Sequence, residues 1–154
     1  ISFEGVEKLR NLNCRYNELT SLDVSKNTEL TNLYCRKNKL TILNVSSNTK
    51  LTNLNCVSNE LASLDVSSNT ELMNLICDNN KLTNLDVSSN TKLDNLSCQY
   101  NHLDTLDLSN NRELTCLICN GTGLTYLDLS MNTKLTELDC DASLEVIGYD
   151  GARW

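Results

Sequence analysis

The sequence repeats every 21 residues, and this period constrains the fold more than any other feature of the chain. Each repeat opens with two leucines and a cysteine in the pattern LxxLxC. The first leucine recurs at Leu9, Leu30, Leu51, Leu72, Leu93, Leu114 and Leu135, and the cysteine at Cys14, Cys35, Cys56, Cys77, Cys98, Cys119 and Cys140. A fixed period of this length is typical of a solenoid, whose units bury their apolar faces against one another. We therefore expect one array of stacked coils.

Each repeat has two halves that follow the same pattern. The unit reads LxxLxCxxNxLxxLDVSxNTx, as in Leu51–Glu71. Apolar and polar residues alternate in LxC and in LDV, which is typical of a short strand with one buried face, and the Asn that follows is a turn residue. No segment has a long apolar period of 3.6 residues, so little helix is expected. The pattern predicts a parallel sheet on one face of the solenoid, with extended segments and turns on the other.

The two ends of the chain depart from the repeat. We interpret residues 1–8 as an N-terminal half-coil because Ile1-Ser2-Phe3 fits the register of Leu-Asp-Val, residues 9–140 as the repeat coils, and residues 141–154 as a C-terminal cap that contains Trp154. Open solenoid ends expose apolar surface and need atypical terminal units. The start within a coil indicates a preceding cap or domain, and any targeting signal is expected to be missing. Proline is absent, in keeping with backbone N–H groups that are all needed for hydrogen bonds between coils.

Composition argues against several classes of function. The 154 residues carry a net charge of -7, so a nucleic-acid partner, which needs clustered basic residues, is not expected. No stretch approaches the roughly 20 apolar residues of a membrane-spanning helix, so no membrane insertion is expected. A single histidine, His102, and the lack of GxSxG, Walker and HExxH motifs argue against an enzyme. We predict no catalytic residue, no cofactor and no metal site.

Seven of the eight cysteines form one column, which has three interpretations. As core thiols, they would alternate with inward leucines and act as small apolar side chains. Disulfides between neighbouring strands are disfavoured by the strand spacing of about 4.8 Å, and metal binding is disfavoured by the linear arrangement. Core thiols are therefore favoured. The eighth cysteine, Cys116, forms a CxxC motif with Cys119, but we expect it on the exposed sheet face as a solvent-facing thiol prone to adventitious dimerisation.

Charged side chains form two columns whose sign alternates from coil to coil. One column is Lys8, Glu29, Lys50, Glu71, Lys92, Glu113 and Lys134, and the other is Glu18, Lys39, Glu60 and Lys81, followed by His102 and Gly123. Because equivalent residues of stacked coils lie about 5 Å apart, we expect opposite charges to pair and to help set the register of stacking. An aspartate row from Asp23 to Asp128 is expected to be solvated rather than to bind Ca²⁺, and the two asparagine columns are expected to be structural.

The motif LxxLxCxxNxL and the LDVSxN second half resemble those of leucine-rich repeat proteins, in particular the internalin type with a cysteine ladder. The resemblance covers about Leu9 to Cys140, and the segment GVEKLRNL at Gly5–Leu12 is also similar. It implies a leucine-rich repeat solenoid whose parallel sheet lies on the concave face. It also implies a bacterial protein, secreted or at the cell surface, that binds a protein or a glycan through that face.

Residues that point outward from the sheet form the predicted binding face. They vary between coils, and they make the face basic at its N-terminal end and acidic at its C-terminal end, at Glu137, Asp139 and Asp141. Tyrosine and arginine are enriched at interface hot spots, and exposed apolar residues often mark contacts. The five candidate contacts are Tyr16, Tyr34, Arg36, Ile76 and Tyr100. Ordinary surface scatter is the alternative interpretation of these residues.

The sequence therefore predicts a non-enzymatic recognition module. The alternative is a structural spacer or a self-assembling repeat unit without a small-molecule ligand. We expect a monomer, with end-to-end association as the other possibility. Aligned threonines raise ice binding as a third alternative, but Arg112 interrupts their row.

Overall fold

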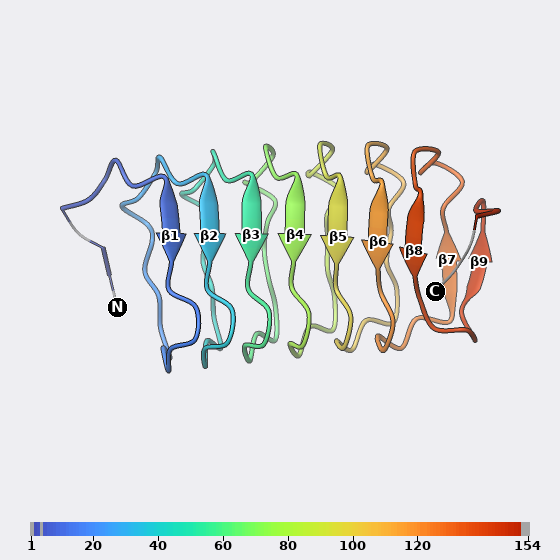
Figure 1. Ribbon diagram of the computed structural model, residues 1–154, viewed down its shortest axis with the longest axis horizontal. Helices are drawn as coiled ribbons and strands as arrows, with labels where there is room; N and C mark the ends of the chain where they lie inside the picture. Colours follow the sequence, from blue (N-terminus) through green and yellow to red (C-terminus); the bar gives the residue numbers. More distant parts are fainter. Residues whose placement is uncertain (1, 4, 152–154) are drawn as a thin grey trace.

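The chain folds into a solenoid whose coils stack along one axis (Figure 1). The structure is a computed structural model that describes residues 2–3 and 5–151. Its strands are β1 (Asn11–Asn13), β2 (Asn32–Tyr34), β3 (Asn53–Asn55), β4 (Asn74–Ile76), β5 (Asn95–Ser97), β6 (Cys116–Ile118), β7 (Tyr126–Asp128), β8 (Glu137–Asp139) and β9 (Glu145–Ile147). The described residues include no helix. The predicted fold class, a leucine-rich repeat solenoid with a parallel sheet, is confirmed.

Seven strands form one parallel sheet in the order β1-β2-β3-β4-β5-β6-β8. Every pair is in register with the repeat, as in Leu12 opposite Leu33 and Leu33 opposite Leu54. The central leucine of each strand is buried and its two neighbours point outward, because side chains alternate across a strand. The leucine column thus sets both the register of the sheet and the side that faces the core.

The cysteine column lies inside the core beside the leucines. All eight cysteines are free thiols, and Cys35, Cys56, Cys77 and Cys98 are completely buried. Burial raises the pKa of the Cys56 thiol to about 12. The column therefore consists of protonated core thiols, and that interpretation is confirmed.

The second half of each coil is an extended segment that leads into a turn, as predicted. Of these segments only β7 is a strand, and it pairs with β9 in a separate parallel sheet. In the other segments the aspartate forms a tight local turn, as where the Ser67 N–H and hydroxyl both donate to Asp65 Oδ1, at 2.9 and 2.6 Å. The aspartate row is exposed as expected, but it also accepts hydrogen bonds from the serine hydroxyls and N–H groups of the turns, which lower the pKa of the Asp65 and Asp86 carboxyls.

Two columns of buried asparagines join each coil to the one before it. The Asn80 amide donates to the carbonyls of Cys56 and Cys77, at 3.1 and 2.9 Å, and its oxygen accepts the Leu61 N–H at 3.1 Å. In the second column the Asn69 amide donates to the carbonyls of Val45 and Asn48, at 3.0 and 2.9 Å. Both columns repeat these bonds along the array, so their predicted structural role is confirmed. They supply partners for buried carbonyls that the sheet does not reach.

The alternating charges form ion pairs between neighbouring coils. Lys39–Glu18, Lys50–Glu29, Lys81–Glu60, Lys92–Glu71 and Lys134–Glu113 lie 2.5 to 2.8 Å apart. The predicted pairing is thus confirmed. All five pairs are exposed, so each contributes only about 0–1 kcal/mol to stability.

Each end of the array is covered differently. At the N-terminus Ser2 forms a parallel bridge with Asp23, as its register predicts, whereas Ile1 lies outside the described residues. At the C-terminus Leu144 is buried and Val146 packs against the core from β9. Trp154 lies outside the described residues.

Replacing a buried asparagine should destabilise the fold far more than breaking an ion pair next to it. Asn80→Ala removes the bonds to three carbonyls and one N–H group, so we expect the free energy of unfolding to fall by about 3 kcal/mol. Lys81→Ala, which breaks the exposed pair with Glu60, should cost less than about 1 kcal/mol. Urea denaturation of both variants measures the difference, and equal losses would contradict the structural role of the asparagine column.

Candidate binding surface

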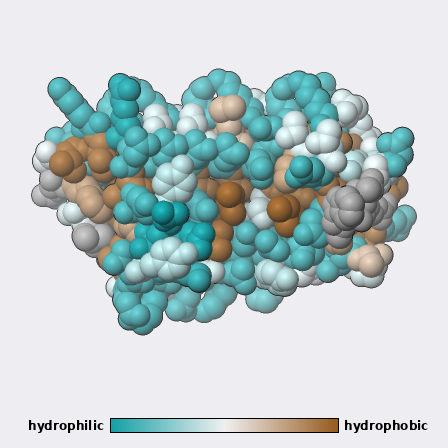
Figure 2. Space-filling view, in the orientation of Figure 1, coloured by the Kyte–Doolittle hydropathy of each residue, from teal (hydrophilic) through white to brown (hydrophobic). Residues whose placement is uncertain are grey.

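The outward side chains of the seven-stranded sheet, together with the two residues that follow each inward cysteine, form the surface that we call the sheet face. Figure 2 shows it with its most hydrophilic residues gathered over the first strands and apolar patches over the middle and later strands. The sheet places one side chain of each column on every coil. The face is therefore a rigid grid whose residues differ from coil to coil.

The first column of the grid is structural. Asn32, Asn53 and Asn74 each donate an amide hydrogen to the asparagine of the preceding coil, at 2.5, 2.6 and 2.8 Å. The column continues to Cys116, which was expected to be exposed. Its exposed fraction is only 9%, and burial, followed by the nearby Glu137 carboxylate, raises the thiol pKa to about 11. The prediction of a solvent-facing thiol was wrong, because Cys116 is buried on the sheet.

At the N-terminal end the structure brings two of the predicted contacts together. Arg36 donates a hydrogen bond to the Tyr16 hydroxyl, and its guanidinium lies 4.8 Å from the centre of the Tyr16 ring. The Lys37 ammonium lies 5.1 Å from the same ring. Cation–π contacts at these distances hold the cations against the ring while the tyrosine itself remains 60% exposed.

The other three predicted contacts are spread along the face. Tyr34 is half-buried on β2, Ile76 is half-buried on β4, and Tyr100 is 54% exposed beyond β5. Tyr16 and Tyr100 occupy the same column four coils apart, which corresponds to about 19 Å. The five residues therefore share one face but do not form a single cluster.

The column that contains the two exposed tyrosines has a backbone conformation that the sequence analysis missed. Five non-glycine residues have a φ between 52° and 55°, namely Tyr16, Lys37, Ser58, Asn79 and Tyr100, and the next member is Gly121 with a φ of 65°. The left-handed region suits glycine or asparagine and costs other residues about 1–2 kcal/mol. The presence of Asn79 and Gly121 at one repeat position was the signal that could have revealed it.

Tyr100 also depends on the glycine of the next coil. A Cβ atom on Gly121 would lie 2.6 Å from Tyr100 Cδ1, so a side chain there would require the ring to move. The Tyr100 ring therefore lies against the Gly121 backbone.

The centre of the face holds a buried carboxylate that the sequence did not single out. Asp78 accepts hydrogen bonds from the Ser97 hydroxyl at 2.6 Å and from the Gln99 amide at 3.3 Å. Asp78 and Ser97 are both buried, and burial raises the pKa of the Asp78 carboxyl despite these bonds. Its position in an outward column gave no sign of burial, because the covering side chains come from the neighbouring coil.

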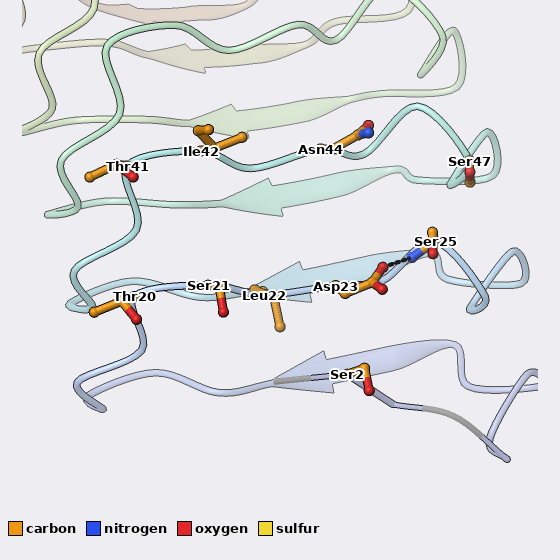
Figure 3. A pocket seen from close by; sticks show the side chains of 10 residues that line it. All are labelled: Ser2, Thr20, Ser21, Leu22, Asp23, Ser25, Thr41, Ile42, Asn44 and Ser47. Carbon is orange, nitrogen blue, oxygen red and sulfur yellow. Dashed lines mark hydrogen bonds between the residues drawn. The ribbon is translucent and has the colours of Figure 1, made fainter.

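Several hollows of the surface lie along the second halves of the coils. Figure 3 shows one of about 580 Å³ between the first coils, lined by residues that include Thr20, Asp23 and Ile42. Equivalent positions around Asp65 and Asp86 line similar hollows farther along. The hollows thus repeat with the coil and contain no predicted contact.

Neither a metal-binding cluster nor a membrane-spanning helix is present in the described part of the chain. Within it, no group of three or more His, Cys, Asp or Glu side chains is arranged to hold a metal ion. No helix in that part is long and apolar enough to cross a membrane.

The raised pKa of Asp78 should make stability depend on pH. Folded Asp78 keeps its proton to higher pH than the unfolded chain does, so the folded state binds more protons above the ordinary pKa of 3.8. The free energy of unfolding of the wild type, relative to that of Asp78→Asn, should therefore fall as pH rises from about 4 towards neutrality. Urea denaturation across this range measures the effect. Asp104→Asn, at an exposed position, is the control, and a difference that does not change with pH would contradict the prediction.

Comparison with known proteins identifies the type of repeat. No protein-family model matches the chain, and no curated protein matches it. Among solved structures, the functional domain of InlJ from Listeria monocytogenes, described as including a cysteine ladder, is 33% identical with a TM-score of 0.67 over 87% of this chain. A leucine-rich repeat protein of Leptospira interrogans is 28% identical with a TM-score of 0.75 over 79% of this chain. The internalin InlF of Listeria monocytogenes, at 22% identity, a TM-score of 0.77 and 91% of this chain, supports the fold alone.

The chain spans 39%, 34% and 43% of the lengths of these three structures. The similarity extends over most of this chain, which has its own column of free cysteines. The chain is therefore similar in fold and in repeat to internalin-like leucine-rich repeat proteins, including one with a cysteine ladder.

Proposed function

We propose that this protein is a non-enzymatic recognition module that binds a protein through the sheet face, with a glycan as the other ligand class. Two exposed tyrosines held in a left-handed backbone conformation carry this proposal. The fold alone would favour glycine or asparagine at Tyr16 and Tyr100, because both residues relieve the backbone cost. A costly side chain that projects into solvent is typical of a functional position.

The rigidity of the face supports the same proposal. Its strands are joined in register and its first column is a ladder of amide hydrogen bonds, so the contact residues are ordered before a ligand arrives. Binding to an ordered surface avoids most of the entropy cost of arranging side chains. Tyr16, Tyr34, Arg36, Ile76 and Tyr100 are the proposed contacts.

The edges of the sheet favour one alternative function, a spacer that self-assembles. β1 and β8 are the outer strands of the seven-stranded sheet, and an outer strand can pair with a strand of another molecule. The sheet face is basic near β1 and acidic near β8, which favours head-to-tail contact. Light scattering over a concentration series distinguishes the two functions, because reversible growth without ligand favours assembly and a constant monomer mass contradicts it.

The context of the module is also a proposal. We infer an extracellular or cell-surface location in a bacterium, supported by similarity to structures from Listeria monocytogenes and Leptospira interrogans. We further propose that residues 9–140 act as the binding array and that residues 141–154 cap it, with Leu144 covering the last coil.

The contribution of Tyr100 can be tested without confusing binding with backbone strain. Arrays of glycans and of purified extracellular proteins supply a ligand, and biolayer interferometry measures its affinity. Tyr100→Gly should weaken binding by more than about 1 kcal/mol, which is about five-fold or more, because tyrosines dominate interface energetics. Ser58→Gly is the matched control, since it relaxes the same left-handed position. It should keep full affinity and raise stability by up to about 1 kcal/mol.

A variant of the opposite face completes this test. Ile42 is 76% exposed beside the hollow of Figure 3, away from the sheet. Ile42→Ser should leave affinity unchanged. A ligand that tolerates both Tyr100→Gly and Tyr34→Ala but is lost by Ile42→Ser would place binding on the opposite face and overturn the proposal.

A further inference from the structure

Three basic residues at the N-terminal end of the sheet face differ from the lysines that pair with glutamates. Five lysines pair with glutamates of a neighbouring coil at 2.5 to 2.8 Å. Arg15, Arg36 and Lys37, in contrast, have no carboxylate within ion-pair distance among the residues that the structure describes. Three unpaired cations gather here in a chain whose net charge is -7.

Two of these cations, Arg15 and Arg36, belong to adjacent coils. Arg15 and Arg36 occupy the same position of adjacent coils, and the backbone bonds around them stay in register, with the Cys14 N–H donating to the Tyr34 carbonyl at 2.9 Å and the Tyr16 N–H to the Arg36 carbonyl at 3.0 Å. Neighbouring parallel segments lie about 4.8 Å apart. Like charges at such a spacing repel, so this arrangement destabilises the free protein unless an anion lies between them.

Neutral groups hold both guanidinium groups in place. Arg15 Nε donates to Asn13 Oδ1 at 3.0 Å, and Arg36 is held by the hydroxyl and the ring of Tyr16. The Nε atom of Arg36 is buried and has no acceptor among the described residues. These contacts orient the guanidinium groups without neutralising them, and a fixed guanidinium is suited to binding the paired oxygens of an oxyanion.

We propose that Arg15 and Arg36, with Lys37 and the Tyr16 hydroxyl beside them, bind an oxyanion: the phosphate, sulfate or carboxylate group of the ligand. The assignment to a ligand rests on the proposed recognition function, but the site itself binds a free anion. A single anionic group fits the face better than a polyanion such as nucleic acid. The same face becomes acidic towards β8, where Glu137, Asp139 and Asp141 would repel an extended anionic chain.

An anion titration followed by amide NMR tests this site directly. Sodium phosphate, sodium sulfate and sodium acetate are added to the full chain at constant ionic strength, with sodium chloride as the reference. Phosphate or sulfate should cause saturable shifts confined to residues near Arg15, Arg36 and Lys37. Saturation by acetate at similar concentrations would assign a carboxylate ligand, whereas weak acetate binding would assign a tetrahedral anion.

Charge-matched variants distinguish specific anion binding at Arg15 and Arg36 from nonspecific electrostatic attraction of anions to the protein. The double variant Arg15→Gln with Arg36→Gln should weaken anion binding at least ten-fold. It should also melt at the same temperature as the wild type or higher, because it removes a repulsion. The control changes net charge equally at two exposed residues outside the cluster, Lys26→Gln with Arg112→Gln, and should bind as the wild type does. Shifts no different from those in chloride, or equal weakening in both double variants, would overturn the site.

The result of the anion titration is independent of the effect of Tyr100→Gly on ligand affinity. Saturable anion binding together with a ligand that ignores Tyr100→Gly would overturn the proposed contact face and leave the anion site standing. A ligand that requires Tyr100, with no anion binding at Arg15 and Arg36, would overturn the anion site alone.

Discussion

The structure depends on each coil satisfying the backbone of its neighbour. Strand hydrogen bonds do this on the sheet face, and buried asparagine amides do it at the turns, where Asn80 alone serves three carbonyls and one N–H group. These side-chain bonds are needed because the backbone N–H and C=O groups of a buried turn must have hydrogen-bond partners. Proline, which lacks an N–H group, is absent from the entire chain. Stacking therefore sets the position of every outward side chain as well as the shape of the core.

Much of the fold could be predicted because the same residue recurs at equivalent positions of successive repeats. The leucines, cysteines and asparagines gave the register, the buried face and the structural turns. The left-handed column could not be recognised in the same way, because Tyr16, Lys37 and Ser58 share no chemistry and only their backbone angle unites them. The burial of Cys116 and of Asp78 was also out of reach, since both occupy outward positions and are covered by side chains from neighbouring coils. The second half of the coil follows the predicted extended segment and turn, and only its last example pairs as a strand, β7 with β9.

The sheet face consists of regular strands, but a few of its residues depart from the choices that the repeat favours, and these residues indicate a function. Tyrosines occupy backbone positions better suited to glycine, and two arginines occupy equivalent positions of adjacent coils, whereas the columns of lysine and glutamate pair opposite charges. Natural sequences depart from locally favourable choices mainly at functional sites. The two departures meet at Tyr16 and Arg36, which places the strongest features of the face at its N-terminal end.

The ion pairs also reveal a unit larger than one coil. Glu18 and Glu29 belong to one coil and both pair with lysines of the next, Lys39 and Lys50, and the following two coils repeat the arrangement. A coil whose paired residues are glutamates is thus followed by a coil whose paired residues are lysines, and we call these two coils a couple. Loss of a single coil by recombination would bring two coils of the same sign together, whereas loss or gain of a couple would leave every junction matched. Such an array can change its length, and with it the reach of its binding surface, most readily in even numbers of coils.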